Sequence, residues 1–328
     1  MKFLLVFLAL CPFSALAGQS SFLLREDVQA FVADMRERNG FESEYLLKLF
    51  AKASELPAVV KAIQPPVEPG IRSWQKYRSR FVEPRRIAAG LTFWQRHAAT
   101  LAKAEARYGV PADIIVGIIG VETMYGKHTG RFQTFSALAT LAFDYPPRAA
   151  LFRLELESLL LLSRDEGRDP LSFRGSYAGA MGLPQFMPSS MRQWAVDFDS
   201  DGKIDLAESP EDAIGSVANF LACHGWQKEG PILIPVQAEG DRINELLTEG
   251  IKPNRLPMEL ADFGIKIADA PALPVALIDY VTPNEPTTYQ LGYNNFYVIT
   301  RYNKSTFYAT AVHDLALSIR DRFNALYR

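Results

Sequence analysis

Cysteine is scarce in this chain, which has two cysteines in 328 residues, Cys11 and Cys223. Cys11 lies in an N-terminal apolar segment that we expect to be removed, which leaves a single thiol and no intramolecular disulfide. A disulfide framework is therefore excluded, and a hydrophobic core must hold the fold, as the 48% content of apolar residues allows. Within ANFLACHGW, we expect Cys223 to be a small buried apolar residue rather than a nucleophile.

An excess of charge is also missing. The formal net charge is −2, charged residues make up 22% of the chain and no Lys/Arg-rich block occurs, so we expect no nucleic-acid partner. After the N-terminal segment, no apolar run is long enough to span a membrane. The four histidines are scattered without the spacing of a zinc site or of a serine triad: His97, His128, His224 and His313.

The first 17 residues have the pattern of a secretory signal peptide. A positive residue precedes an apolar run, and the small residues of 15-ALA-17 offer a cleavage site before Gly18. Cys11 leaves open a lipoprotein alternative, but Leu10 is bulky for the position before a lipidated cysteine. We therefore predict a signal peptide at 1–17, a periplasmic location and no lipid anchor.

Helical periodicity dominates the rest of the chain. We expect helices over 22–62 with a break at Gly40, and over 87–110, 134–143, 146–166, 187–195, 210–222 and 309–326. The stretch from 230 to 300 differs, because it is rich in proline and contains short β-prone runs such as ILIPV and FYVIT. The segment 64-QPPVEPG-70 is a linker or turn. The expected fold class is α+β, mostly helical.

A single acid ends the most apolar segment, 114-IIVGIIGVETMYGKHTG-130. A helix from Pro111 to about Tyr125 would be apolar on nearly every face, so it belongs in the core and carries Glu122 in its last turn. Burial and the negative end of the helix dipole would both raise the pKa of Glu122, which is what a general acid needs. The alternative, a surface glutamate paired with Lys127, is not excluded by this pattern.

A glycine-rich stretch follows, 174-RGSYAGAMGLPQFMPSSM-191. Its glycines and alanines would let the backbone approach a ligand closely, and Ser176 and Gln185 would add hydrogen bonds. The alternative is an ordinary turn before a helix that starts near Pro188. The pattern is not that of a nucleophile elbow.

An acidic loop, 197-DFDSDGKIDLAESPEDAIGS-216, has the spacing of an EF-hand. Alternate carboxylates around a glycine suit a hard cation such as calcium. The expected ligands are Asp197, Asp199, Asp201, the backbone carbonyl of Lys203 and a closing acid.

The usual register of such a loop would close it with Glu208. However, Ser209 is a good N-cap, and Pro210 suits the first helical position, which puts Asp212 at the third. A helix that began earlier would contain Pro210 at a cost of about 3 kcal/mol. We therefore predict that Asp212 closes the loop. The alternative is a solvated acidic turn in which Asp212 only caps its helix.

Taken in order, GVET-x-YG, GSYAGAMGLPQFMPSS, the acidic loop, AIGSVANF and HGW resemble the lytic murein transglycosylase B family. WQKYRSRFV (74–82) and ITRYNKSTFYATAV (299–312) extend the resemblance over nearly all of the expected mature chain. It implies a lysozyme-like catalytic core with additions. The boundaries we expect are 18–105 for an N-terminal helical region, 106–229 for the core with its EF-hand-like loop, 230–298 for a small mixed or β insertion, and 299–328 for a return to the core.

The family cleaves the β-1,4 bond between N-acetylmuramic acid and N-acetylglucosamine in peptidoglycan, for cell-wall remodelling or turnover. The resemblance implies that Glu122 protonates the leaving oxygen and then, as a carboxylate, helps to deprotonate the muramyl C6 hydroxyl. That hydroxyl attacks C1 and closes a 1,6-anhydro ring. An intramolecular nucleophile removes the need for the second carboxylate that most glycosidases use.

The resemblance also implies the contacts with the glycan strand: Tyr77, Ser176, Gln185, Tyr302, Asn303, Tyr308, and Phe220 where some relatives have tyrosine. Pro147-Arg148 replaces an Arg-Arg pair of some relatives, which puts peptide-stem binding in doubt. Calcium would be structural, no organic cofactor is needed, and we expect a monomer, with cell-wall synthesis or division proteins as conceivable partners. Two alternatives are a hydrolytic muramidase, and a non-catalytic peptidoglycan-binding protein stabilised by calcium.

Overall fold

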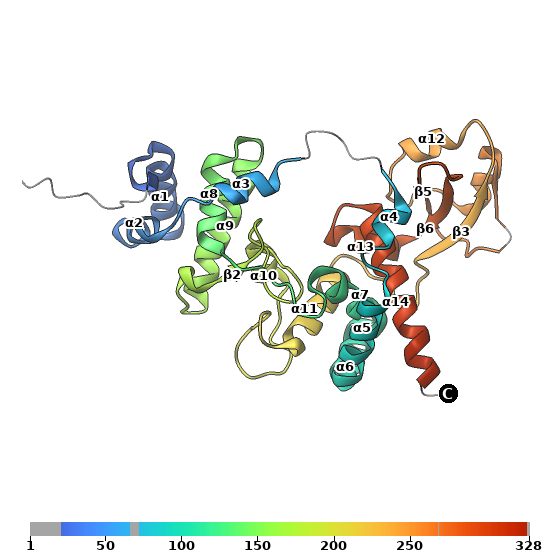
Figure 1. The fold of residues 1–328 in the computed structure, drawn as a ribbon, viewed down its shortest axis with the longest axis horizontal. Helices are drawn as coiled ribbons and strands as arrows, with labels where there is room; N and C mark the ends of the chain where they lie inside the picture. Colours follow the sequence, from blue (N-terminus) through green and yellow to red (C-terminus); the bar gives the residue numbers. More distant parts are fainter. Residues whose placement is uncertain (1–20, 66–71, 268, 327–328) are drawn as a thin grey trace, which may run out of the picture.

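The computed structural model describes residues 21–65, 72–267 and 269–326 (Figure 1). Most of these residues lie in helices, and the strands form two small antiparallel sheets. The expected α+β, mostly helical class is confirmed. The predicted signal peptide and most of the proline-rich segment 64–70 lie outside the described residues. Within the described part, no helix combines the length and the apolar character needed to cross a membrane.

One group of helices packs at the end of the molecule where the described chain begins (Figure 1). It combines early and later segments of the chain: α1 (Glu26–Asn39), α2 (Ser43–Lys52), α3 (Pro57–Ile63), α8 (Thr134–Asp144) and α9 (Ala149–Asp165). Helix α1 ends where we predicted, at Gly40, whose φ of 70° is in the left-handed region that favours glycine. Phe50 joins the two segments, since its ring centroid lies 5.3 Å from that of Phe135.

A second group surrounds the apolar helix α7 (Ala112–Thr123), which contacts α5, α6, α11 and α14. These neighbours are α5 (Pro84–Arg96), α6 (Ala98–Tyr108), α11 (Pro210–Cys223) and α14 (Thr306–Leu326). The helical spacing over 87–110 belongs to two helices, because His97 leaves helical geometry with φ −112° and ψ 25°. Two shorter helices of this part are α4 (Trp74–Arg78) and α13 (Asn294–Tyr302). Helix α10 (Pro188–Trp194) connects the two groups, because it packs mainly on α9 and also contacts α11.

The proline-rich region forms a four-stranded antiparallel sheet of order β4-β3-β6-β5. Its strands are β3 (Leu233–Ala238), β4 (Ile265–Lys266), β5 (Ala276–Tyr280) and β6 (Thr288–Gly292). With α12 (Ile243–Thr248), the sheet encloses a hydrophobic cluster separate from the main core. A second, two-stranded sheet pairs β1 (Phe132–Gln133) with β2 (Arg174–Gly175).

Two local predictions are wrong. The run FYVIT, expected as β-prone, lies in helix α13, where Phe296, Val298 and Ile299 are fully buried. Packing against α11 and α14 outweighs the β preference of so short an apolar run. Cys223 is exposed rather than buried, because it falls on the last residue of α11, beyond the face that packs on α7.

Candidate active site and metal loop

The apolar helix α7 carries Glu122 in its last turn, as predicted. Every other residue of the helix is buried, whereas Glu122 keeps intermediate exposure. The helix ends at Thr123, and the next residue, Met124, turns the chain sharply with a φ of 51°. Glu122 is therefore held by a core element without being fully buried itself.

The environment of Glu122 favours the protonated acid. Burial raises the pKa of Glu122 to about 7. The hydroxyl of Tyr308 donates a hydrogen bond to Glu122 Oε1 at 2.6 Å, and this bond opposes the rise because it stabilises the carboxylate. Among the described residues, no second carboxyl group contributes to the pKa of Glu122. The predicted rise is confirmed, and burial is its main cause.

Three predicted groove tyrosines gather around this acid. The charge of Glu122 raises the pKa values of Tyr77, Tyr302 and Tyr308, after the larger effect of burial. The rings of Tyr302 and Tyr308 are nearly parallel, at 12°, with centroids 6.5 Å apart. All three phenols remain protonated at neutral pH, so they supply hydroxyl groups and aromatic faces without adding charge.

The glycine-rich loop lies against the end of α7. The Thr123 hydroxyl donates to the Leu183 carbonyl at 2.9 Å, and the Tyr302 hydroxyl donates to the Pro184 carbonyl at 2.5 Å. A side chain at Gly182, where φ is +72°, would place Cβ 2.4 Å from the Leu206 carbonyl oxygen. Glycine is thus needed at position 182 because the loop packs against the backbone of Leu206. We had expected glycine there for the close approach of a ligand.

The polar residues of this loop are partly used to hold its shape. Gln185 has φ 51°, and its amide donates to the carbonyls of Thr129 and Gly182 at 3.0 and 3.1 Å. The Ser176 hydroxyl accepts from the Ala180 amide at 3.1 Å. Both side chains keep intermediate exposure, so each can still offer atoms to a ligand beside its structural bond.

The other two sequence-predicted groove residues differ in position. Phe220 is buried on α11, and its ring meets that of Tyr302 edge-on at 4.9 Å, so it supports the tyrosine from behind. Asn303 is exposed at the end of α13. In the described part of the chain, the hydrogen bond of the Glu122 side chain goes to Tyr308 and none joins it to Asn303.

Two residues that position the site were not singled out from the sequence. Thr123, next to the acid, links α7 to the loop, and its oxygen also accepts from the Gly126 amide at 3.0 Å. Arg86 of α5 donates to the Gly120 carbonyl at 3.0 Å, near the C-terminus of α7. Thr123 lies within the quoted GVET motif, which could have indicated it, but no sequence signal connects Arg86 with α7.

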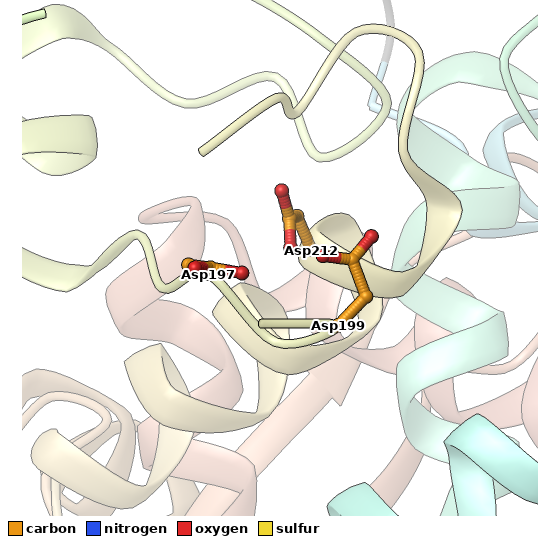
Figure 2. A group of neighbouring side chains, drawn as sticks. All are labelled: Asp197, Asp199 and Asp212. Atoms are coloured by element: carbon orange, nitrogen blue, oxygen red, sulfur yellow. The ribbon is translucent and has the colours of Figure 1, made fainter. Parts of the chain in front are cut away.

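The acidic loop brings three carboxylates together, as Figure 2 shows. One oxygen each of Asp197, Asp199 and Asp212 lie within 4.8 Å of one another. Within the described residues, Asp201 and Glu208 fall outside this group. The Asp201 carboxylate turns back to accept the Lys203 amide at 2.8 Å, and the amide of exposed Glu208 donates to the Asp205 carboxylate at 3.0 Å.

The start of helix α11 agrees with the predicted longer loop, which Asp212 rather than Glu208 closes. The Ser209 hydroxyl caps α11 by accepting from the Asp212 amide, with Pro210 at the first position. Asp212 is almost fully buried, and its two oxygens accept from the amides of Phe198 and Asp205, both at 2.8 Å. Burial raises the pKa of Asp212, so close approach to two further carboxylates is unfavourable without a cation. The donor set, all carboxylate oxygens, fits calcium.

Comparisons with known proteins agree with this geometry. Residues 24–317 match the family model described as the transglycosylase SLT domain. The chain is 39% identical over 312 residues to the membrane-bound lytic murein transglycosylase B of Escherichia coli K12, covering 91% of this chain and 84% of that protein.

Two solved structures illustrate the similarity of fold. The catenated lytic transglycosylase SltB1 from Pseudomonas aeruginosa matches with a TM-score of 0.86 at 45% identity, over 91% of this chain and 98% of that one. An Escherichia coli lytic transglycosylase in complex with calcium matches with a TM-score of 0.83 at 37% identity, over 93% and 96%.

Proposed function

The chain belongs to the SLT-type transglycosylase family and is a lytic murein transglycosylase, and from this premise we propose that Glu122 is its single catalytic acid. Such an enzyme cleaves the β-1,4 bond between N-acetylmuramic acid and N-acetylglucosamine and leaves a 1,6-anhydromuramic acid end. The observation that carries the assignment is the position of Glu122 in the last turn of the buried helix α7, where it accepts a hydrogen bond from Tyr308 at 2.6 Å. Burial there raises its pKa to about 7.

The hydrogen bond from Tyr308 decides which oxygen of Glu122 carries the proton. Because the Tyr308 hydroxyl donates to Oε1, the acid proton is on Oε2, where it can pass to the glycosidic oxygen. The carboxylate that results keeps the Tyr308 bond, which stabilises the new charge. It then takes the proton of the C6 hydroxyl as this oxygen bonds to C1, and Glu122 is protonated again.

Among the described residues, no second carboxyl group shifts the pKa of Glu122, and this favours the route with an internal nucleophile over hydrolysis. A hydrolytic enzyme needs a second carboxylate, as nucleophile at about 5–5.5 Å or as base for water at about 6.5–9.5 Å. A C6 hydroxyl already held beside C1 has the advantage of an intramolecular reactant. The tyrosines 77, 302 and 308 would line the groove in which the sugar rings are held.

The products test the proposal directly. Mass spectrometry of fragments released from purified murein should find ends lighter by one water than the hydrolysed ends. Glu122→Gln should release neither product while still binding murein. Substantial anhydro product from the pure variant would show that Glu122 is not the acid. Hydrolysed ends from the natural protein would favour the muramidase alternative instead.

We also propose that the loop holds a structural calcium ion through Asp197, Asp199 and Asp212, with the Lys203 carbonyl and Asp201 completing the set. The convergence of the three carboxylates and the calcium complex of a relative support this assignment. Calcium would offset the repulsion among these groups and so stabilise the start of α11. It takes no part in proton transfer, because Glu122 lies on a different helix.

The expected location in the periplasm is part of the same proposal. The leader pattern at 1–17 and the murein substrate both support export to the cell envelope. The N-terminus of the exported protein distinguishes the two processing routes: Gly18 is expected, whereas an acylated Cys11 would show that the chain is a lipoprotein.

A further inference from the structure

A cavity of about 760 Å³ opens beside helix α4. We call it the α4 cavity; Arg72, Lys76, Arg80, Tyr77 and Phe307 are among the residues that line it. Helix α4 lies beside α14 (Figure 1), and the two helices contact each other. The cavity therefore borders the helix that carries Tyr308.

Tyr77 lies between the surroundings of the α4 cavity and those of Glu122, since it lines the first and responds to the charge of the second. The pKa of Tyr77 is raised by the charge of Glu122 and lowered by that of Arg80, after the larger effect of burial. Phe307 directly precedes Tyr308, and its ring centroid lies 5.6 Å from that of Tyr77. A group attached to a sugar ring beside Glu122 can thus reach Arg80 by passing Tyr77.

The positive charge of this cavity is largely unbalanced. Arg72 pairs with Asp279 at 2.8 Å and lies 4.6 Å over the ring of Phe307, so its charge is offset. Lys76 and Arg80 are exposed, and among the described residues neither forms an ion pair. No carboxylate belongs to the lining residues. Two free cations, four residues apart, therefore face one space.

We propose that the α4 cavity binds a carboxylate of the peptide stem carried by the muramic acid next to the cleaved bond. This inference rests on the proposed function. The N-acetylated sugars of a stem-bearing strand are neutral, so its negative charge lies in the peptides. Lys76 and Arg80 offer the charged donors that a carboxylate binds, and Tyr77 and Phe307 offer apolar surface to the stem.

The test compares murein oligomers of one length that differ only in charge. One carries stems with free carboxylates, and the other carries the same stems as primary amides. The proteins are the natural chain, the variant Lys76→Gln/Arg80→Gln, and a matched control, Lys61→Gln/Lys228→Gln, that removes two exposed charges outside the cavity. All these side chains are exposed, so the variants should fold. The readout is kcat/KM for release of anhydro product.

The natural protein should prefer the free-carboxylate oligomer by about tenfold at low salt, and the preference should shrink as salt rises. The cavity variant should lose this preference through a higher KM, while the control keeps it. Equal cleavage of both oligomers by the natural protein, or an unchanged preference in the cavity variant, would overturn the proposal. Loss of preference in both variants would also overturn it, since that indicates a long-range field. Absence of anhydro product from either oligomer would instead contradict the proposed function.

Discussion

Replacing Glu122 by glutamine should stabilise the protein at alkaline pH. Burial raises the pKa of Glu122 from 4.5 to about 7, so the folded protein binds this proton more tightly than the unfolded chain does. The contribution of this proton to the free energy of unfolding is fully present below pH 4.5 and is lost as pH rises through about 7. At roughly 1.4 kcal/mol for each pH unit, the ionised carboxylate lowers the free energy of unfolding by up to about 3 kcal/mol above pH 7.

Glutamine removes this charge and keeps the shape of the acid. Its amide oxygen can still accept the hydrogen bond from Tyr308. We therefore expect Glu122→Gln to raise the free energy of unfolding by about 2–3 kcal/mol at pH 8 and by less than about 1 kcal/mol at pH 5. Urea unfolding at the two pH values measures both numbers. A matched control is Glu55→Gln, at an exposed position, where the change should stay within about 0.5 kcal/mol at both pH values.

The pH dependence is the decisive part of this experiment. An equal gain at pH 5 and pH 8 would mean that glutamine improves packing rather than relieving a buried charge. A loss of stability at pH 8 would mean that the carboxylate of the folded protein is well solvated. Either result would refute the explanation of Glu122 as a desolvated acid, even if the variant were inactive.

Three further outcomes are expected. The rate of anhydro product release should fall as pH rises through about 7. In Tyr308→Phe the carboxylate of Glu122 loses its hydrogen-bond donor, so this fall in rate should occur at higher pH. The maximum rate of the variant should be about tenfold lower. Calcium should raise the melting temperature, by an amount that corresponds to about 2.7 kcal/mol at a hundred times its Kd. Asp212→Asn should abolish this rise, whereas Glu208→Gln should retain it; the reverse order in a calcium titration would restore the earlier register. Gly182→Ala should lower the free energy of unfolding by more than about 1 kcal/mol, since its φ is +72° and the added Cβ would lie 2.4 Å from the Leu206 carbonyl oxygen; an unchanged urea midpoint would contradict this.

The parts of the fold that were predictable depend on local signals. Gly40 ends α1, and Ser209 with Pro210 starts α11, because capping and fixed φ values act within a few residues. The strand expected from the β-prone run FYVIT was wrong because distant contacts, not local signals, decide its structure. Its helix is stabilised by contacts with α11 and α14, which no local pattern reveals. Exposure of Cys223 was missed similarly, since helical periodicity alone does not say where the buried face ends.

The site was predictable only in part for a related reason. The position of Glu122 at the end of an apolar helix follows from its own segment. Its main partner, Tyr308, lies 186 residues away in the sequence, and only the resemblance to a known family suggested it. Neither the local sequence nor the resemblance indicated the hydrogen bond of Arg86 to the Gly120 carbonyl, because this bond joins two helices through a backbone atom.

The uncharged tyrosines around Glu122 suit the proposed use of one acid for two proton transfers. In the proposed mechanism, Glu122 is protonated before cleavage and ionised during ring closure, so its pKa has to lie near the working pH. A second carboxylate nearby would raise that pKa further, and a cation in contact would lower it. Tyr302 and Tyr308 avoid both effects, because burial raises their pKa values well above the ordinary value and keeps them uncharged. Their hydroxyl groups still donate hydrogen bonds, one of them to Glu122 itself. Lys76 and Arg80 lie beyond Tyr77, in the α4 cavity, and neither is among the groups that shift the pKa of Glu122. They can therefore act on a substituent of the sugar without fixing the protonation state of the acid.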